Sequence, residues 1–104
     1  MSLDDLSIND MFIVGGLKEA TRDKEQMDYI YYCLERFFAG DYGEIPTEDI
    51  EANNGELEKS NGRIIAKYKP EAGLTDYFYI MAHFNEEQPE EEYNYTSIFY
   101  CIDY

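Results

Sequence analysis

Residues 63–84 read RIIAKYKPEAGLTDYFYIMAHF, and this stretch decides the fold. Residues 63–69 alternate between apolar side chains and mostly basic ones, which is the period of a half-buried strand. Residues 76–84 are rich in aromatic and branched side chains, which favour a second strand. Residues 70–75 between them contain Pro and Gly, so we predict a turn and an antiparallel hairpin.

Two helices are predicted on the N-terminal side of this hairpin. Apolar residues recur at spacings of three and four over 22–39, with Thr21 as the expected N-cap and Gly40 at the end. Residues 48–60 predict the second helix, because Thr47 is a suitable N-cap and acids follow it in the first turn.

The expected architecture is one α+β domain over residues 1–104. We predict a mainly antiparallel sheet of about four strands, with both helices packed on one face. The strands are expected at 11–17, 63–69, 76–84 and 95–102. The length suits a single core, and eleven Tyr and six Phe supply enough apolar surface to fold.

The chain is strongly acidic. It has 23 Asp and Glu against 8 Lys and Arg, a formal net charge of −15. Residues 37–58 and 70–104 contain many acids and no Lys or Arg. Such a charge repels nucleic acid and anionic membranes, so we expect no direct contact with either. The N-terminus is acidic where a signal peptide needs basic residues, which predicts a cytoplasmic protein.

Motifs of catalysis are not found in the sequence. His83 is the single histidine, so a zinc site or a His-based triad would need partners that the chain does not offer. Gly15-Gly16 lacks the further residues of a phosphate-binding loop. Cys33 and Cys101 lie in apolar stretches, which predicts free, unreactive thiols. The sequence therefore favours a protein that is not an enzyme and holds no cofactor or metal.

A Ca²⁺ or Mg²⁺ site is the alternative for the loop 40–49. Asp41, Glu44 and Asp49 supply the oxygen ligands that hard cations prefer. Their spacing does not match an EF-hand loop, and turn formation with helix capping explains the same residues. We therefore favour a structural role for them.

The segments 40–44 (GDYGE) and 62–68 (GRIIAKY), with Glu48, Asp49 and Asn53 between them, carry a resemblance. They resemble a family of small uncharacterised bacterial proteins carried on plasmids, phages and other mobile elements, whose motif reads Gly-Asp-Trp/Tyr-Gly. The resemblance implies a mobile-element origin and no particular chemistry, because the family has no known function. Residues 82–87 depart from the family pattern, which has an arginine there.

The leading hypothesis is a non-enzymatic interaction module that binds a basic protein partner, as an inhibitor or a nucleic-acid mimic. Mobile elements often encode inhibitors of host defence proteins that bind nucleic acid. The expected contact residues are acids and one tyrosine of two segments: Asp41, Tyr42, Glu44, Glu48, Asp49, Glu51, Glu86, Glu87, Glu90, Glu91 and Glu92.

Two alternatives remain open. The first is a domain that binds a small ligand or a metal through the loop 40–49 together with His83, in a pocket where the loop meets the end of the strand 76–84. The second is a homodimeric structural subunit that pairs through the Tyr-rich last strand, as an exposed sheet edge would allow.

Overall fold

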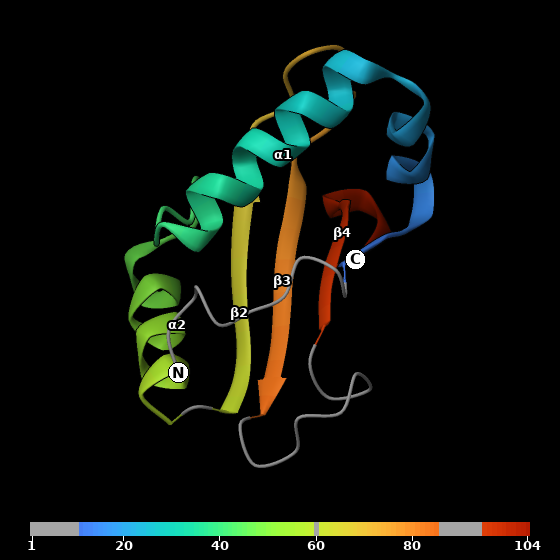
Figure 1. Cartoon of the computed structure of the whole chain (residues 1–104). Coiled ribbons are helices and arrows are strands. Elements are labelled where there is room, and N and C mark those ends of the chain that lie inside the picture. The colour runs from blue at the N-terminus through green and yellow to red at the C-terminus, as the bar shows by residue number, and fades with distance from the viewer. Residues whose placement is uncertain (1–10, 60, 86–94) are drawn as a thin grey trace.

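The predicted hairpin forms the centre of the sheet. The computed structural model describes residues 11–59, 61–85 and 95–104. In it, β2 (Asn61–Tyr68) and β3 (Phe78–Asn85) pair antiparallel along their whole length. Both strands are straight and long in Figure 1. The alternation of residues 63–69 therefore predicted this pair correctly.

The sheet is mixed, with strand order β1-β4-β3-β2. The strand β4 (Tyr95–Tyr100) pairs antiparallel with β3, whereas β1 (Met11–Ile13) pairs parallel with β4. The α+β class is confirmed, and the parallel outer strand is the difference from a purely antiparallel sheet. The last strand ends at Tyr100 because Cys101–Asp103 form a short 3-10 helix.

The predicted strand 11–17 is wrong after Ile13. The chain enters a 3-10 helix at Gly15–Arg22, with Leu17 and Ala20 buried. Residues three apart share one side of a 3-10 helix, so the apolar residues after Ile13 form a helical stripe. A short apolar run is compatible with a strand or with a helix, so its pattern alone could not decide between them.

The helix α1 (Lys24–Phe38) begins at a different cap from the one predicted. The carboxylate of Asp23 accepts a hydrogen bond from the Gln26 N–H at 3.0 Å, which is an N-cap bond. The Thr21 hydroxyl instead donates to the Lys18 carbonyl, inside the 3-10 helix. Gly40 follows the helix at φ 87°, which confirms its predicted place.

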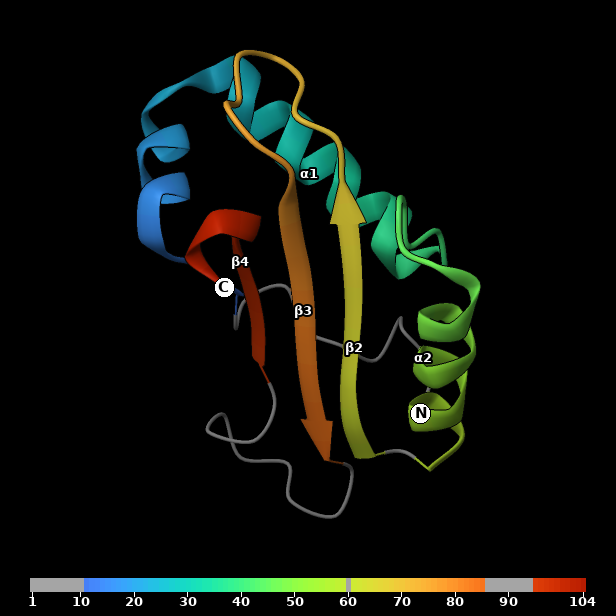
Figure 2. The same cartoon turned by 180° about the vertical axis from the view of Figure 1, so that it is seen from behind.

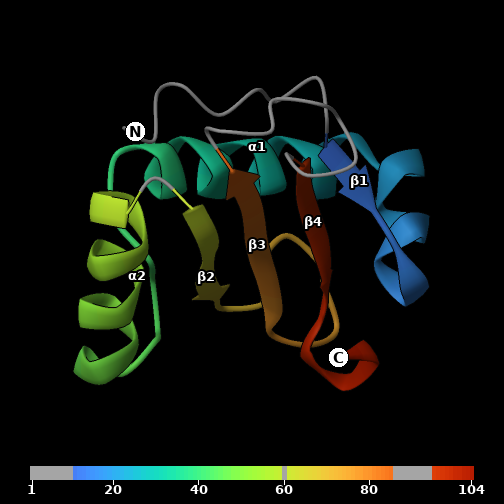
Figure 3. The same cartoon turned by 90° about the horizontal axis from the view of Figure 1, so that it is seen from below.

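The core lies between α1 and one face of the sheet. Ile30, Leu34 and Phe37 of α1 belong to the same buried cluster as Ile64 and Ile80 of the sheet. Figure 3 shows α1 lying across one side of β2, β3 and β4. Because side chains alternate along a strand, every second strand residue points away from this core.

The helix α2 (Thr47–Lys59) does not share that face, so this part of the prediction is wrong. It lies beside the outer edge of β2 in Figures 1 and 3. Within α2, all of which the structure describes, Asn53 alone is buried. A helix with so few apolar residues has no stripe to bury on a sheet face, which explains its place at the edge.

No helix within the described residues is long and apolar enough to cross a membrane.

Candidate functional site

The segments that carry the resemblance meet at the outer edge of β2. The Lys67 N–H donates to the Tyr42 carbonyl at 3.1 Å, and the Glu44 N–H donates to the Lys67 carbonyl at 2.7 Å. Gly43 between them forms a parallel bridge to Lys67. The loop thus takes the place of a neighbouring strand for two residues and satisfies the edge groups of β2.

Asn53 closes the same edge one step further along. Its amide nitrogen donates to the Ile65 carbonyl at 2.8 Å, and its oxygen accepts from the Ile65 N–H at 3.1 Å. A side-chain carboxamide has the donor and acceptor of a peptide group, so it replaces one strand residue. Asn53 is 2% exposed, which makes this pair of bonds the anchor of α2.

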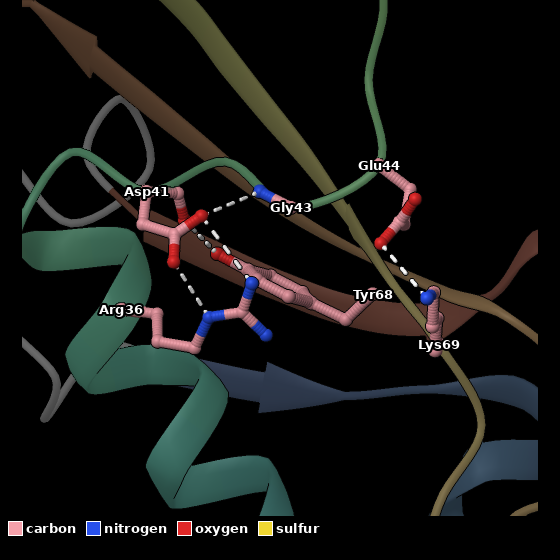
Figure 4. Close-up of polar contacts among 6 residues, drawn as sticks. All are labelled: Arg36, Asp41, Gly43, Glu44, Tyr68 and Lys69. Carbon is pink, nitrogen blue, oxygen red and sulfur yellow. Dashed lines mark hydrogen bonds and ion pairs between the residues drawn. The ribbon is translucent and has the colours of Figure 1, made fainter.

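Asp41 and Arg36 form the ion pair of Figure 4. The Arg36 Nε donates to the Asp41 carboxylate at 2.7 Å, and the Gly43 N–H donates to it at 3.1 Å. The bond from Arg36 holds the pKa of Asp41 below its usual range. The Tyr68 hydroxyl donates to the Asp41 carbonyl at 2.7 Å, and the guanidinium lies 5.0 Å from the centre of the Tyr68 ring. The carboxylate of Asp41 is therefore engaged in holding the loop.

A small cavity opens beside this ion pair. Its volume is about 250 Å³, and its walls come from α1, the 43–44 loop and the end of β2. The lining includes Tyr29, Tyr32, Arg36, Glu44 and Lys69. The Lys69 Nζ lies 3.6 Å from the Glu44 carboxylate, and the Tyr29 hydroxyl donates to the Lys69 carbonyl at 2.7 Å. Burial raises the pKa of Tyr29, so its hydroxyl stays neutral and remains a donor.

His83 lies elsewhere, so the predicted pocket of loop and histidine does not form. Its ring stacks on the Tyr95 ring, with 4.5 Å between the ring centres. His83 lies opposite Arg63 in the sheet, and Arg63 is four residues away from Lys67, where the loop is bound. Its side chain is on the sheet face away from α1. Burial and the neighbouring Arg63 lower the pKa of His83.

The loop carboxylates do not converge on a cation. Asp41 is bonded to Arg36, Glu44 is paired with Lys69, and Asp49 lies on α2. Within the described residues, no three His, Cys, Asp or Glu side chains are grouped so that they could hold a metal ion.

The predicted contact residues separate into three groups. Asp41 and Glu44 are held in ion pairs, and Tyr42 is 5% exposed. Three acids are exposed on α2, and no ion pair between described residues involves them: Glu48, Asp49 and Glu51. The other five lie outside the described residues: Glu86, Glu87, Glu90, Glu91 and Glu92.

The outer side of α2 is an acidic stripe, which we define as Glu48, Glu51 and Glu58. All three side chains are exposed. Their separations of three and seven residues place them on one side of the helix. Lys59 is the one base of α2.

A second surface lies on the sheet. The sequence predicted pairing through the edge of the Tyr-rich last strand, but β4 is an inner strand because β1 pairs with it. The face of the sheet away from α1, here called the open face, carries aromatic and apolar side chains such as Tyr79, Met81 and Phe99. Phe12 and Tyr104 contact this set and are 55% and 69% exposed. The available signal was that the strand residues alternating with the core residues are aromatic where a solvated face would be polar.

Comparison with protein-family models, curated proteins and solved structures gives no match, so geometry and charge carry the functional argument.

Proposed function

We propose that this protein is a non-enzymatic acidic interaction module that binds a basic protein partner through the acidic stripe of α2. The observation that carries the proposal is the way α2 is attached. Asn53 is the one buried residue of this fully described helix, and the helix presents exposed carboxylates along its outer side.

The helix is attached by specific hydrogen bonds although it adds little to the core. Its two bonds to Ile65 fix its position against the sheet edge. Glu48 and Glu51 are about 4.5 Å apart along the helix axis, and Glu58 lies about 10.5 Å beyond, given the rise per residue of an α-helix. Carboxylates held at fixed intervals can fill a groove lined with Lys and Arg that would otherwise hold nucleic acid.

The net charge of −15 supports the same partner class, because it raises the rate of encounter with a basic protein. The resemblance to proteins of bacterial mobile elements is consistent with an inhibitor that imitates nucleic acid. A basic host protein that binds nucleic acid is the partner that this chemistry fits.

The test separates the stripe from the total charge. One variant carries Glu48→Gln, Glu51→Gln and Glu58→Gln. The control carries Glu19→Gln, Glu25→Gln and Glu35→Gln, which removes the same charge from exposed positions on other elements. Each form is immobilised and offered a bacterial lysate, and the retained basic proteins are identified and then titrated as pure proteins by calorimetry.

We expect the stripe variant to lose at least tenfold in affinity and the control to lose much less. Wild-type affinity should fall as salt rises, because exposed charges are screened. Equal losses in the two variants, or binding that does not change with salt, would overturn the proposal.

The cavity beside Arg36 favours a second candidate function, the binding of a small polar ligand. Its lining combines Arg36 and Lys69 with Glu44 and Glu71, so both charge signs are present, as a zwitterion such as a free amino acid requires. A thermal-shift screen with the free amino acids tests this, with Glu71→Gln as the variant that should lose the shift. A screen without any shift removes this candidate.

A further inference from the structure

The open face of the sheet has the composition of an interface. Ile65, Tyr79, Met81, Tyr95 and Phe99 alternate with the core residues of their strands and therefore point away from α1. Figure 2 shows this side, with β2, β3 and β4 in front of α1. Neither α1 nor α2 lies across it, whereas the 3-10 helix Cys101–Asp103 lies at its margin beside the end of β4.

The aromatic rings of the open face contact one another. The Tyr104 ring stacks on the Phe99 ring, with 5.7 Å between their centres, and its centre lies 5.5 Å from that of the Tyr79 ring. Phe12 meets Tyr95 edge-on at 6.3 Å. Phe99 and Met81 are buried, at 8% and 5% exposure, whereas Phe12 and Tyr104 at the margins of the face are 55% and 69% exposed. Exposed aromatic side chains are enriched in the contact surfaces of proteins.

The charge of this face is unlike that of the rest of the chain. The four described strands contain no Asp or Glu, in a chain that has 23. Their two bases, Arg63 and Lys67, both belong to the open face by alternation. A basic partner would be repelled at this face, so the acidic stripe and the open face call for different occupants.

We propose that the open face binds a second copy of this chain, face to face, to form a symmetric dimer. Two chains of charge −15 repel each other, and the strands of this face add no acid to that repulsion. Burial raises the pKa of Tyr79, and the charge of Asp49 on α2 adds to this, so one acid of α2 does lie near the face. The acidic stripe lies on α2 beside the edge of the sheet, so its side chains are not part of the open face.

Charge also selects the symmetry axis. The bases lie on β2, and Tyr95 and Phe99 lie on β4, two strands away. A twofold axis across the strands would place β2 against its own copy and bring bases together. An axis along the strands places β2 over β4, which sets Arg63 over the partner's Tyr95 and Lys67 over the partner's Phe99 as cation–π pairs.

The test is sedimentation velocity over a wide range of concentration. We expect wild type to be dimeric, and Phe12→Glu and Tyr104→Glu to weaken association at least tenfold. Both residues are more than half exposed, so their replacement leaves the core intact. Tyr31→Glu is the matched control, since Tyr31 is 48% exposed on α1, away from the open face.

The axis is tested in a Cys101→Ser background. A mixture of Arg63→Cys and Tyr95→Cys chains should form the mixed disulfide faster than Arg63→Cys forms one with itself. Faster self-linkage, a monomeric wild type at every concentration, or a dimer that Phe12→Glu does not weaken would each overturn the proposal. Higher salt should strengthen this dimer, because it screens like-charge repulsion, and weaken binding of a basic partner, so the two proposals fail separately.

Discussion

At Gly43 the loop and the sheet approach each other closely. Its φ of 69° lies in the left-handed region. A Cβ there would overlap the Lys67 carbonyl oxygen and lie 2.9 Å from the Tyr68 ring. The close approach is what allows Tyr42 and Glu44 to bond to Lys67.

The substitution Gly43→Ala should therefore cost more than the backbone strain alone. Gly40 is the matched control, because its φ is 87° and a Cβ there meets nothing within 4 Å. We expect Gly40→Ala to lower the free energy of unfolding by about 1 kcal/mol. Gly43→Ala should lower it by about 2–3 kcal/mol, since edge hydrogen bonds are also lost. Urea unfolding measures both, and equal midpoints would contradict the edge closure.

Asn53 is the second residue with a large expected effect. Asn53→Ala removes both bonds to Ile65 and leaves the Ile65 peptide groups without their partner. We expect a loss of about 2–3 kcal/mol in the free energy of unfolding. The neighbouring Asn54→Ala, at an exposed position, should change it by less than about 0.5 kcal/mol. A similar small effect for both variants would show that α2 is anchored in another way.

At the scale of elements, the sequence and the structure give different N-caps for α1, Thr21 and Asp23. Asp23→Ala should cost about 1 kcal/mol of stability, because its carboxylate caps the Gln26 N–H. Thr21→Ala should be close to neutral, since the Thr21 hydroxyl lies on the surface of the preceding 3-10 helix. Thermal unfolding of the two variants decides between the caps. A larger loss of stability for Thr21→Ala than for Asp23→Ala would identify Thr21 as the N-cap.

The elements that sequence predicted well are those with a clear period. The alternation of β2 and the apolar stripe of α1 each determine a structure and an orientation, because the buried face is visible in the pattern. The parallel pairing of β1 could not be predicted, since alternation says nothing about which neighbour an end strand selects. The position of α2 depends on Asn53, a polar residue that no search for apolar positions would identify. The weak apolar content of α2 was the one signal of its peripheral place.

The sequence located the acids of the candidate site but not their partners. Glu48, Asp49 and Glu51 are exposed, Asp41 and Glu44 are also exposed but form ion pairs, and Tyr42 is buried. Sequence shows where acids occur, but it does not show which of them an arginine or lysine will neutralise. Three-dimensional proximity decides that point, as Arg36 does for Asp41.

At the scale of the whole molecule, stability should depend on pH in a predictable direction. The pKa of His83 is lowered from its usual 6.5, so the unfolded chain takes up this proton first as pH falls. The contribution of neutral His83 to the free energy of unfolding is fully present above about pH 6.5, and it is lost as the pH falls from there through the lowered pKa. Asp41, whose pKa is lowered from 3.8, adds a further loss below about pH 4.

The variant His83→Gln isolates the first of these steps. The groups that face His83 from the neighbouring strands are Arg63 on β2 and Tyr95 on β4, and both remain in the variant. We expect wild type to lose stability relative to His83→Gln as the pH falls below 6.5, as measured by urea unfolding. Parallel pH profiles for the two proteins would show that the histidine titrates alike in both states.

The closed edge of β2 also separates the residues that hold the fold from those that are free to vary. The loop, Asn53 and β2 constrain one another, so a change in one is tolerated only with a change in another. The acidic stripe carries no such mutual constraint, because its side chains are exposed and make no ion pair among the described residues. Substitutions in the stripe can therefore change what the protein binds while its fold stays the same, whereas substitutions in the loop or at Asn53 change the fold first.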